Sequence, residues 1–404
     1  MVSTDFLPSI GGVTQHIVEV AKAILARGDS LEVVAPAYAS AWKDIWKPPY
    51  LETQQGIPVW RIPYVINRTV KFVTGQISSR ISGRRFNKAL LRRLHETKPE
   101  VVHWHALESR WHPMRDWSGS ARVWTNHTSH FIVGLTSRRR AFYQTEAEQA
   151  DEIIAPSEEL CDLTASLAIP RERIHFIPNG VDCRRFSPAA DAEVWRNQLH
   201  LKDGERAVLC PRRLERKNGV SYFIQAAILL LRQGCKNTRF VTAGDFSGPK
   251  AESEEELVAR LVSESGFDDR FTLLGRVQNQ DMPGLYACSH VVVMPSLMEA
   301  TSLSAMEAMA TSKPIVSTDV GGLPFLVRND ENGLLVPPRD AARLAEAIKR
   351  VMDEPELAAR FGMAGRARVE RELDWSAIAE STRSIYRKAI ERYTSSKAGT
   401  SGNR

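Results

Sequence analysis

Two glutamates, Glu299 and Glu307, lie eight positions apart around a predicted helix start. The apolar run 291–294 precedes them, a helix is predicted over 304–310, and a second apolar run follows at 315–316. Strand, loop, helix and strand in this order predict the unit from which parallel sheets are built. Ligands of such sheets bind where a strand ends and the next helix begins, and the free N–H groups of a helix start bind phosphate. The segment therefore predicts a phosphate site bracketed by two carboxylates.

A cationic loop follows the predicted strand 207–210 and precedes a helix predicted over 221–233. It contains Arg212, Arg213, Arg216 and Lys217. Arginine and lysine side chains clustered beside a helix start favour a diphosphate, because they combine opposite charge with hydrogen-bond donors. A solvated surface loop is the alternative interpretation.

In the first half of the chain, polar side chains repeatedly follow predicted strands. His103 and His105 end the strand predicted over 100–106, and His127 lies near the end of the strand predicted over 123–128. A doubly wound α/β fold keeps its site at the carboxyl ends of its strands. One such histidine is more often structural than catalytic, but three in one half favour a functional site.

A glycine pair, Gly11 and Gly12, precedes a helix predicted over 14–27, and residues 1–4 look like the tail of a strand whose front is missing. Glycines between a strand and a helix let the backbone approach a ligand closely. A tight turn is the alternative. The pattern is not GxGxxG, so it does not support a dinucleotide site.

The stretch 68–98 is basic and amphipathic, with nine lysines and arginines against the single acid Glu96. Such a stretch can lie on an anionic membrane surface or bind an anionic acceptor. A solvated helix face is the alternative. We do not expect nucleic acid as a partner, because no recognisable binding module accompanies the charges.

The composition is that of a globular protein, with 404 residues, 43% hydrophobic residues, 25% charged residues and a net charge of +6. The amino end lacks the basic start and apolar core of a signal peptide, and no apolar run is long enough to span a membrane. Five scattered cysteines without a CxxC pair predict free thiols, no zinc site and a reducing, cytoplasmic location.

Two halves of alternating strands and helices predict an α/β protein with two Rossmann-like domains that face each other across a cleft. We expect the first domain over 1–186, joined by a carboxyl-terminal helix at about 375–394, and the second over 187–374. A polar stretch at 187–204 is the expected linker. The tail 395–404 is poor in apolar residues and is expected to be disordered.

Motifs along nearly the whole chain resemble those of the retaining glycosyltransferases of family 4, which have the GT-B fold. The most specific is the pair of glutamates with seven residues between them. The matching segments are, in order, Phe6–Val13, Val102–His105, Ile177–Asp182, Arg212–Leu214 with Lys217–Gly219, Glu299–Ala310, Gly321–Gly322 and Asn332–Val336.

The resemblance implies a UDP- or GDP-sugar donor held by the second domain, with Glu307 on the ribose and Glu299 on the sugar. The loop between them, Ala300, Thr301, Ser302 and Leu303, would lie near the sugar and phosphate. The other implied binding residues are Arg213 or Arg212 with Lys217 on the diphosphate, Arg276 and Val277 beside the base, and Gly11 and Gly12 at the phosphates. The implied catalytic residues are His105, Lys217 and Glu299.

The resemblance further implies transfer to a hydroxyl acceptor, lipid-linked or a cell-envelope glycan precursor, with retained anomeric configuration. No DxD motif stands at the donor site, so metal-free catalysis is expected. Thr301–Ser302 departs from the family's glycine-containing loop, and Thr311–Pro314 from its Gly-x-Pro. A sugar-nucleotide epimerase and a non-catalytic sugar-nucleotide-binding protein are the alternative functions.

Overall fold

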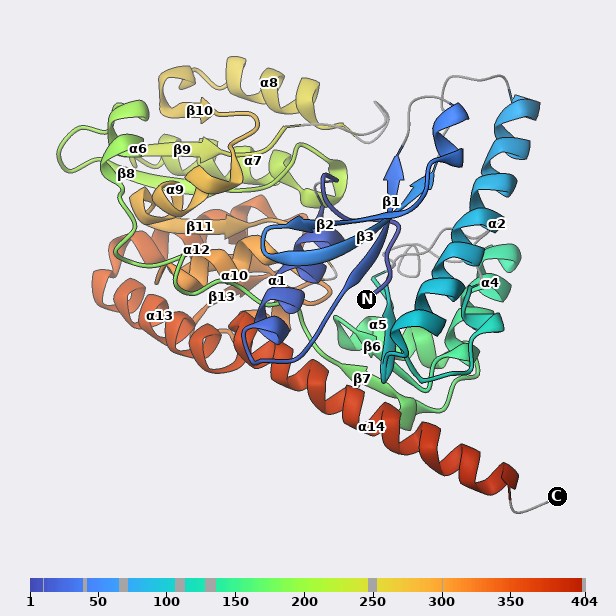
Figure 1. Ribbon diagram of the computed structural model, residues 1–404. Coiled ribbons are helices and arrows are strands. Elements are labelled where there is room, and N and C mark those ends of the chain that lie inside the picture. Colours follow the sequence, from blue (N-terminus) through green and yellow to red (C-terminus); the bar gives the residue numbers. More distant parts are fainter. Residues whose placement is uncertain are drawn as a thin grey trace. The chain divides into compact units, whose positions relative to one another are not determined.

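The computed structural model describes residues 1–9, 11–38, 42–64, 72–105, 113–127, 136–245, 253–299 and 301–401 (Figure 1). The chain divides into two compact units. The first contains Met1–Pro178 and Trp375–Arg404, and the second contains Asn179–Asp374. The boundary expected at 187 therefore lies inside the second unit.

The second unit is built on a six-stranded parallel sheet in the order β10-β9-β8-β11-β12-β13. Numbered along the chain within this unit, the order is 3-2-1-4-5-6, the doubly wound Rossmann arrangement. Its first and fourth strands, β8 and β11, are neighbours. The strands are β8 (Arg206–Cys210), β9 (Thr238–Thr242), β10 (Phe271–Leu273), β11 (Val291–Met294), β12 (Ile315–Thr318) and β13 (Gly333–Val336).

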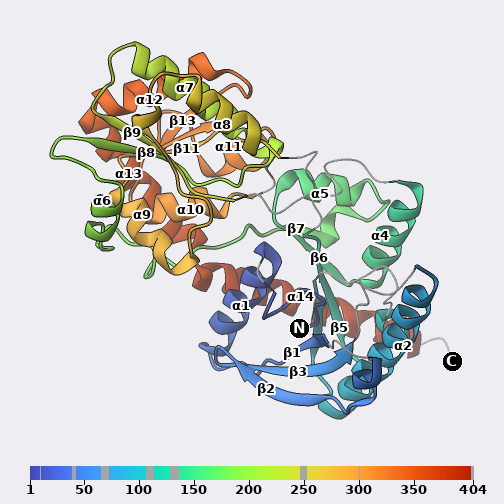
Figure 2. The same ribbon diagram turned by 90° about the horizontal axis from the view of Figure 1, so that it is seen from above.

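Helices cover both faces of this sheet (Figure 2). One group packs together as α7 (Val220–Arg232), α8 (Glu255–Ser263) and α12 (Ala341–Asp353). The other contains α9 (Met282–Cys288), α10 (Leu303–Ala310) and α13 (Pro355–Arg368), with the short α11 (Leu323–Leu326) beside α10. The stretch expected as a linker contains α6 (Glu193–Gln198), which packs on α9. Trp195 of α6 is buried, so this stretch is part of the second unit and the linker prediction is wrong.

The first unit contains a three-stranded and a four-stranded sheet, joined through the amino-terminal residues. Val2 pairs in parallel with both Val34 and Trp104, and its carbonyl accepts the N–H of His105 at 3.0 Å. The strands are β1 (Val33–Tyr38), β2 (Tyr50–Gln54) and β3 (Ile57–Tyr64) on one side, and β4 (Val101–Trp104), β5 (Ala121–Thr125), β6 (Glu152–Ala155) and β7 (Ile174–Phe176) on the other. Among these described strands, β2 alone runs antiparallel to its neighbour.

The helices of the first unit are α1 (Gly12–Leu25), α2 (Phe72–Thr97), α4 (Ser137–Gln149), α5 (Glu158–Ala165) and α14 (Trp375–Ser401). Helix α14 follows the second unit in the sequence but belongs to the first unit. It packs on α1 and along β4, β5 and β6 (Figure 1). The helix continues through Ser401, so the disorder predicted from 395 is wrong for 395–401. Local contacts extend it, since the Ser396 hydroxyl donates to the Tyr393 carbonyl and Lys397 lies 4.7 Å over the Tyr393 ring.

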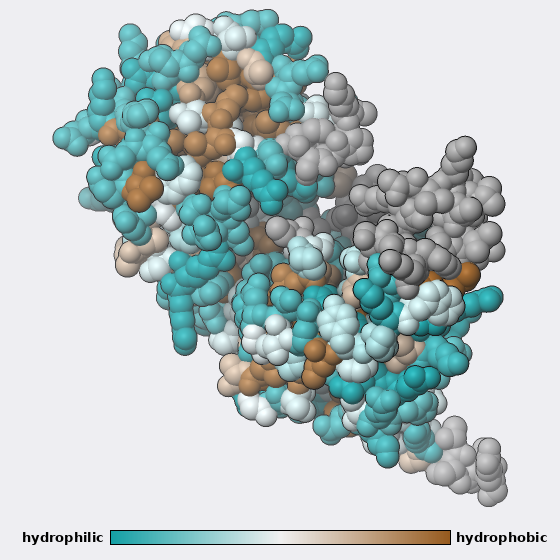
Figure 3. Space-filling model, turned by 45° about the horizontal axis from the view of Figure 1, so that its top comes forward, coloured by the Kyte–Doolittle hydropathy of each residue, from teal (hydrophilic) through white to brown (hydrophobic). Residues whose placement is uncertain are grey.

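The described surface in Figure 3 is mostly hydrophilic, with hydrophobic residues gathered in patches. Within the described ranges, every helix is too short or too polar to cross a membrane. All five cysteines are free, as predicted, and four of them are buried.

Candidate active site

An ion pair joins the loops that follow the first and fourth strands of the second unit. The Arg212 guanidinium pairs with the Glu299 carboxylate, and each side chain is 12% exposed. Arg212 also donates to Asn218 Oδ1 at 2.6 Å, while its buried Nε–H has no hydrogen-bond partner in the part of the chain that the structure describes. A buried guanidinium with a spare donor is suited to an anion.

The neighbouring cations point elsewhere. Arg213 pairs with Glu215 at 2.8 Å and is 53% exposed, and Lys217 pairs with the same carboxylate at 3.1 Å. Of the two candidate arginines, Arg212 is the one beside Glu299, and the choice of which one binds the diphosphate stays a prediction. Lys217 is held to Arg213 through Glu215, so these two cations lie next to each other without contacting Glu299 through any ion pair that the structure describes.

Backbone contacts hold the two loops together. The Lys217 carbonyl accepts the N–H groups of Leu297 at 2.7 Å and Met298 at 3.2 Å. Gly219 has φ +64, and a Cβ there would lie 2.1 Å from the Pro295 carbonyl oxygen. Only glycine fits such a left-handed, close approach. The cationic loop is therefore fixed against the loop that leads to Glu299.

A second glycine fixes Glu299 from the other side. Gly321 has φ +53, and a Cβ there would lie 1.7 Å from the Glu299 carbonyl oxygen. The same oxygen accepts the Gly322 N–H at 3.0 Å. The Gly-Gly segment after β12 thus determines where the backbone of Glu299 lies.

Helix α10 begins directly after this loop. Ser302 caps it, since its hydroxyl accepts the Ala305 N–H at 3.2 Å, and Leu303 is the first helical residue. Thr301 is partly buried. Ala300 lies outside the described residues. The predicted helix start is therefore present, and the Ser302 cap satisfies one of its backbone N–H groups. Its binding of phosphate stays a prediction.

Glu307 lies within α10 and is held by a residue that the sequence did not single out. The hydroxyl of the fully buried Tyr286, in α9, donates to Glu307 Oε2 at 2.8 Å. Burial raises the pKa of Glu307, and the Tyr286 hydrogen bond acts in the opposite direction. Tyr286 was missed because it occupies an ordinary apolar position of a short helix.

Arg276 and Val277 follow β10, on the far side of β9 from the ion pair. Arg276 is exposed and Val277 partly buried. The Gly244 N–H donates to the Gly275 carbonyl at 2.7 Å, which ties the ends of β9 and β10 together. Their contact with a nucleobase stays a prediction.

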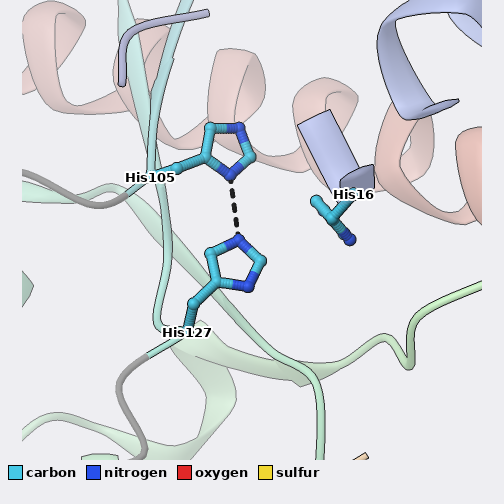
Figure 4. Close-up of side chains that lie close together, drawn as sticks. All are labelled: His16, His105 and His127. Atoms are coloured by element: carbon cyan, nitrogen blue, oxygen red, sulfur yellow. Dashed lines mark hydrogen bonds between the residues drawn. The ribbon is translucent and has the colours of Figure 1, made fainter. Parts of the chain in front are cut away.

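In the first unit, three imidazoles converge beyond the strand ends (Figure 4). His105 Nδ1 lies 3.1 Å from His127 Nε2, and the His16 ring centroid lies 4.8 Å from that of His127. Burial lowers the pKa of His105 and His127 well below the usual value, so both are neutral at neutral pH. His16, in the first turns of α1, was missed because it lies within an amphipathic pattern that reads as core.

His103 and His105 are two positions apart in an extended chain and point the same way, with ring centroids 4.1 Å apart. His103 is structural, since its nitrogens contact the hydroxyls of Tyr386 at 2.8 Å and Thr125 at 2.6 Å.

Gly12 starts α1, and a Cβ there would meet nothing within 4 Å. Gly11 caps the helix in an extended conformation, so neither glycine is required by local crowding.

Comparison with known families finds a matching family model for each unit. Residues 191–368 match the family described as glycosyl transferases group 1, and residues 10–185 match glycosyltransferase family 4. The chain belongs to the group 1, family 4 glycosyltransferases. The predicted family is therefore confirmed.

Several curated relatives of this glycosyltransferase are D-inositol 3-phosphate glycosyltransferases. That of Xylanimonas cellulosilytica is 26% identical over 95% of this chain and 93% of its own length. That of Corynebacterium efficiens is 30% identical over 65% of each chain. An MMP alpha-(1->4)-mannosyltransferase from Mycolicibacterium hassiacum is 29% identical over 61% of this chain and 56% of its own.

Solved structures confirm the GT-B fold. Sucrose-phosphate synthase from Thermosynechococcus elongatus aligns over 96% of this chain and 99% of its own with a TM-score of 0.74 at 24% identity. The Anabaena protein HepE in complex with UDP-glucose aligns over 98% of this chain and 99% of its own, with a TM-score of 0.71 at 19% identity.

We expect Gly321→Ala to destabilise the protein strongly, because its Cβ would lie 1.7 Å from the Glu299 carbonyl oxygen. Gly266→Ala is the matched control, since Gly266 also has a positive φ (+76) but open space around it. Urea unfolding followed by circular dichroism should show a loss of about 1 kcal/mol for the control and about 2–4 kcal/mol for Gly321→Ala. Equal losses would show that the contact with Glu299 does not constrain the loop.

Proposed function

We propose that this glycosyltransferase moves a sugar from a UDP- or GDP-sugar to a hydroxyl acceptor, with retained anomeric configuration and without a metal ion. The buried Arg212–Glu299 pair beside the start of α10 carries the proposal. It places a cation with a spare donor, a carboxylate and a helix amino end at the switch point of a Rossmann sheet. Nucleotides bind at that point of such sheets.

The cations and the helix start would stabilise the departing diphosphate. Breaking the bond between the sugar C1 and the phosphate oxygen leaves negative charge on the phosphates, and fixed positive groups lower the energy of that charge. Arg212 is already oriented by Asn218 and Glu299, so little reorganisation is needed. Arg213 and Lys217 add charge nearby, at the price of releasing Glu215.

The two glutamates take different parts of the donor. Glu299, fixed by Gly321 and Arg212, is assigned to hydroxyl groups of the sugar. Glu307, one helix turn further on, is assigned to the ribose diol, because a carboxylate accepts two hydroxyl hydrogen bonds side by side. Tyr286 orients that carboxylate. Thr301, Ser302 and Leu303 supply the backbone near the phosphates.

His105 is assigned to the donor sugar, and Gly11 and Gly12 to the phosphates.

In retention by same-face attack, the acceptor oxygen bonds to C1 as the bond from C1 to the phosphate breaks. The acceptor proton passes to the departing phosphate oxygen. No step requires a metal, because the cationic side chains take the role of a Lewis acid.

An anionic acceptor fits the relatives and the basic helix. The names of several relatives specify an inositol phosphate acceptor. A phosphorylated polyol, free or linked to a lipid, would be attracted by the exposed cations of α2. A sugar-nucleotide epimerase would yield a second nucleotide sugar without a glycoside, and a non-catalytic binder would leave the donor unchanged.

The donor assignment is tested with a thermal-shift panel of UDP-, GDP- and ADP-sugars on the intact protein. We expect one UDP- or GDP-sugar to raise the melting temperature, because a ligand that binds only the folded state stabilises it. Glu307→Ala should lower the affinity for that donor at least tenfold in calorimetry. Glu346→Ala removes an exposed carboxylate of α12 and should leave the affinity unchanged. Wild-type affinity in Glu307→Ala would refute the ribose assignment.

The stereochemical assignment is tested on the product of that donor. With an α-linked nucleotide sugar, the new glycoside should show the α anomeric proton coupling in NMR from the first turnovers. A β product would exclude same-face attack. A released epimeric nucleotide sugar, or an unchanged donor, would select one of the alternative functions.

We further propose that α2 contacts anionic membrane surfaces and that the enzyme works in the cytoplasm, where free thiols persist. Arg84, Lys88 and Arg92 recur every four residues and are exposed, which makes one cationic stripe. Arg93 does not belong to this stripe, because its guanidinium donates two hydrogen bonds, of 3.0 and 2.6 Å, to the Glu32 carboxylate. Trp46 lies beside the stripe, 59% exposed and 4.3 Å from the Arg85 guanidinium.

Binding to vesicles tests this surface. We expect sedimentation with phosphatidylglycerol vesicles that weakens as salt rises, since salt screens the attraction. Changing Arg84, Lys88 and Arg92 to Gln should lower binding at least tenfold at about 1 kcal/mol per charge. The control changes Arg343, Lys349 and Arg350 of α12 to Gln and removes the same charge. Equal binding to neutral vesicles, or equal losses in both variants, would refute the proposal.

A further inference from the structure

Three histidines of the first unit meet although they come from separate elements (Figure 4). His16 is supplied by α1, His105 follows β4 and His127 follows β5. One ring nitrogen from each lies within 4.8 Å of the others. Among the described residues, no other set of three histidine, cysteine or carboxylate side chains has such an arrangement.

The spacing suits a tetrahedral ion. Zinc binds histidine nitrogen at about 2.0–2.1 Å, which places two tetrahedral ligand nitrogens about 3.3 Å apart. His105 Nδ1 and His127 Nε2 are 3.1 Å apart already. In the structure they share a hydrogen bond. With an ion between them, each ring would bind through this nitrogen and carry its proton on the other one. The ring nitrogen of His16 then has to approach by up to about 1.5 Å, from within 4.8 Å to about 3.3 Å, which rotation about the side-chain torsions can supply.

The donor chemistry selects the class of metal. Neutral imidazoles bind zinc, copper and nickel, whereas magnesium and calcium require oxygen ligands. Burial keeps His105 and His127 neutral. No carboxylate belongs to the group that the structure describes. A zinc ion with three histidines and a water as fourth ligand is the form that this donor set favours.

A second observation shows that the cluster is not a satisfied polar core. His105 is 1% exposed, and its Nε2 has no hydrogen-bond partner within the described ranges. Its neighbour His103 has both nitrogens engaged, by Thr125 and Tyr386. This Nε2 is not the nitrogen that faces His127, so with an ion on Nδ1 it would carry the ring proton, and no described residue competes for it.

We propose that His16, His105 and His127 bind a zinc ion, and that the bound ion inhibits glycosyl transfer by occupying His105. The binding part stands on the histidine geometry alone. The inhibition part rests on the proposed function, in which His105 contacts the donor sugar. Zinc would thus act as a regulator of the enzyme and not as a catalyst.

Metal binding is tested on the tag-free, full-length protein after chelation and desalting. Titration with Co²⁺ should give the intense visible absorption of a tetrahedral complex at one ion per chain, and Zn²⁺ should abolish it. His16→Gln and His127→Gln should each weaken Co²⁺ binding at least tenfold. His95→Gln, at an exposed histidine of α2, is the control and should bind as the wild type does.

Two results would overturn the site: no tetrahedral spectrum in the wild type, or wild-type Co²⁺ affinity in both His16→Gln and His127→Gln. Far-UV circular dichroism and the melting temperature establish that each variant is folded. Two variants are used, because a loss in one could reflect local unfolding.

Inhibition is measured as the ratio of transfer rates with and without Zn²⁺. We expect at least a tenfold loss in the wild type, reversed by chelator, and a much smaller loss in His16→Gln. Metal binding without inhibition would refute the role of His105 at the sugar and leave the metal site intact. Absence of metal binding would refute the metal site and leave the transferase proposal intact.

Discussion

The carbonyl oxygen of Glu299 lies so close to Gly321 that no side chain fits between them, and the candidate site of the second unit depends on this contact. The loop after β11 is held there on one side and by the Lys217 carbonyl on the other. With its backbone fixed twice, Glu299 directs its carboxylate toward Arg212. The strand order makes this possible, because β8 and β11 are neighbours although β9 and β10 intervene in the chain.

The first unit repeats this logic with different side chains. The segment around Val2 lies between β1 and β4 and leads into α1, while β4 leads to His105. Two connections leaving adjacent strand ends again bring distant residues together, here His16 and His105. The topology therefore explains why a helix residue and a strand-end residue share a site in a chain whose hydrophobic pattern does not relate them.

Strands, helices and their order could be predicted from the sequence, because they depend on the spacing of apolar residues. Contacts that depend on where a side chain points could not. The strand at 291–294 and the helix near 304–310 were predicted because a polar loop separates an apolar run from a helix-forming segment. Arg212 and Arg213 could not be separated, since spacing does not say which of two adjacent residues faces Glu299. Tyr286 and His16 were missed because partners that come from another element leave no local signal. The disorder predicted from residue 395 was wrong as far as residue 401, because a segment with few apolar residues can still continue a helix through its own backbone hydrogen bonds.

The candidate site residues of the two units differ in charge, and this difference fits the two charges that develop in the proposed reaction. The departing diphosphate gains negative charge, and the second unit offers the arginine and lysine side chains near α10. The sugar gains positive charge as its bond breaks, and the histidines of the first unit are kept neutral by burial. A protonated histidine beside the sugar would oppose that charge. A divalent ion would oppose it more strongly, so a metal bound by the same histidines would slow this reaction even if the donor could still enter.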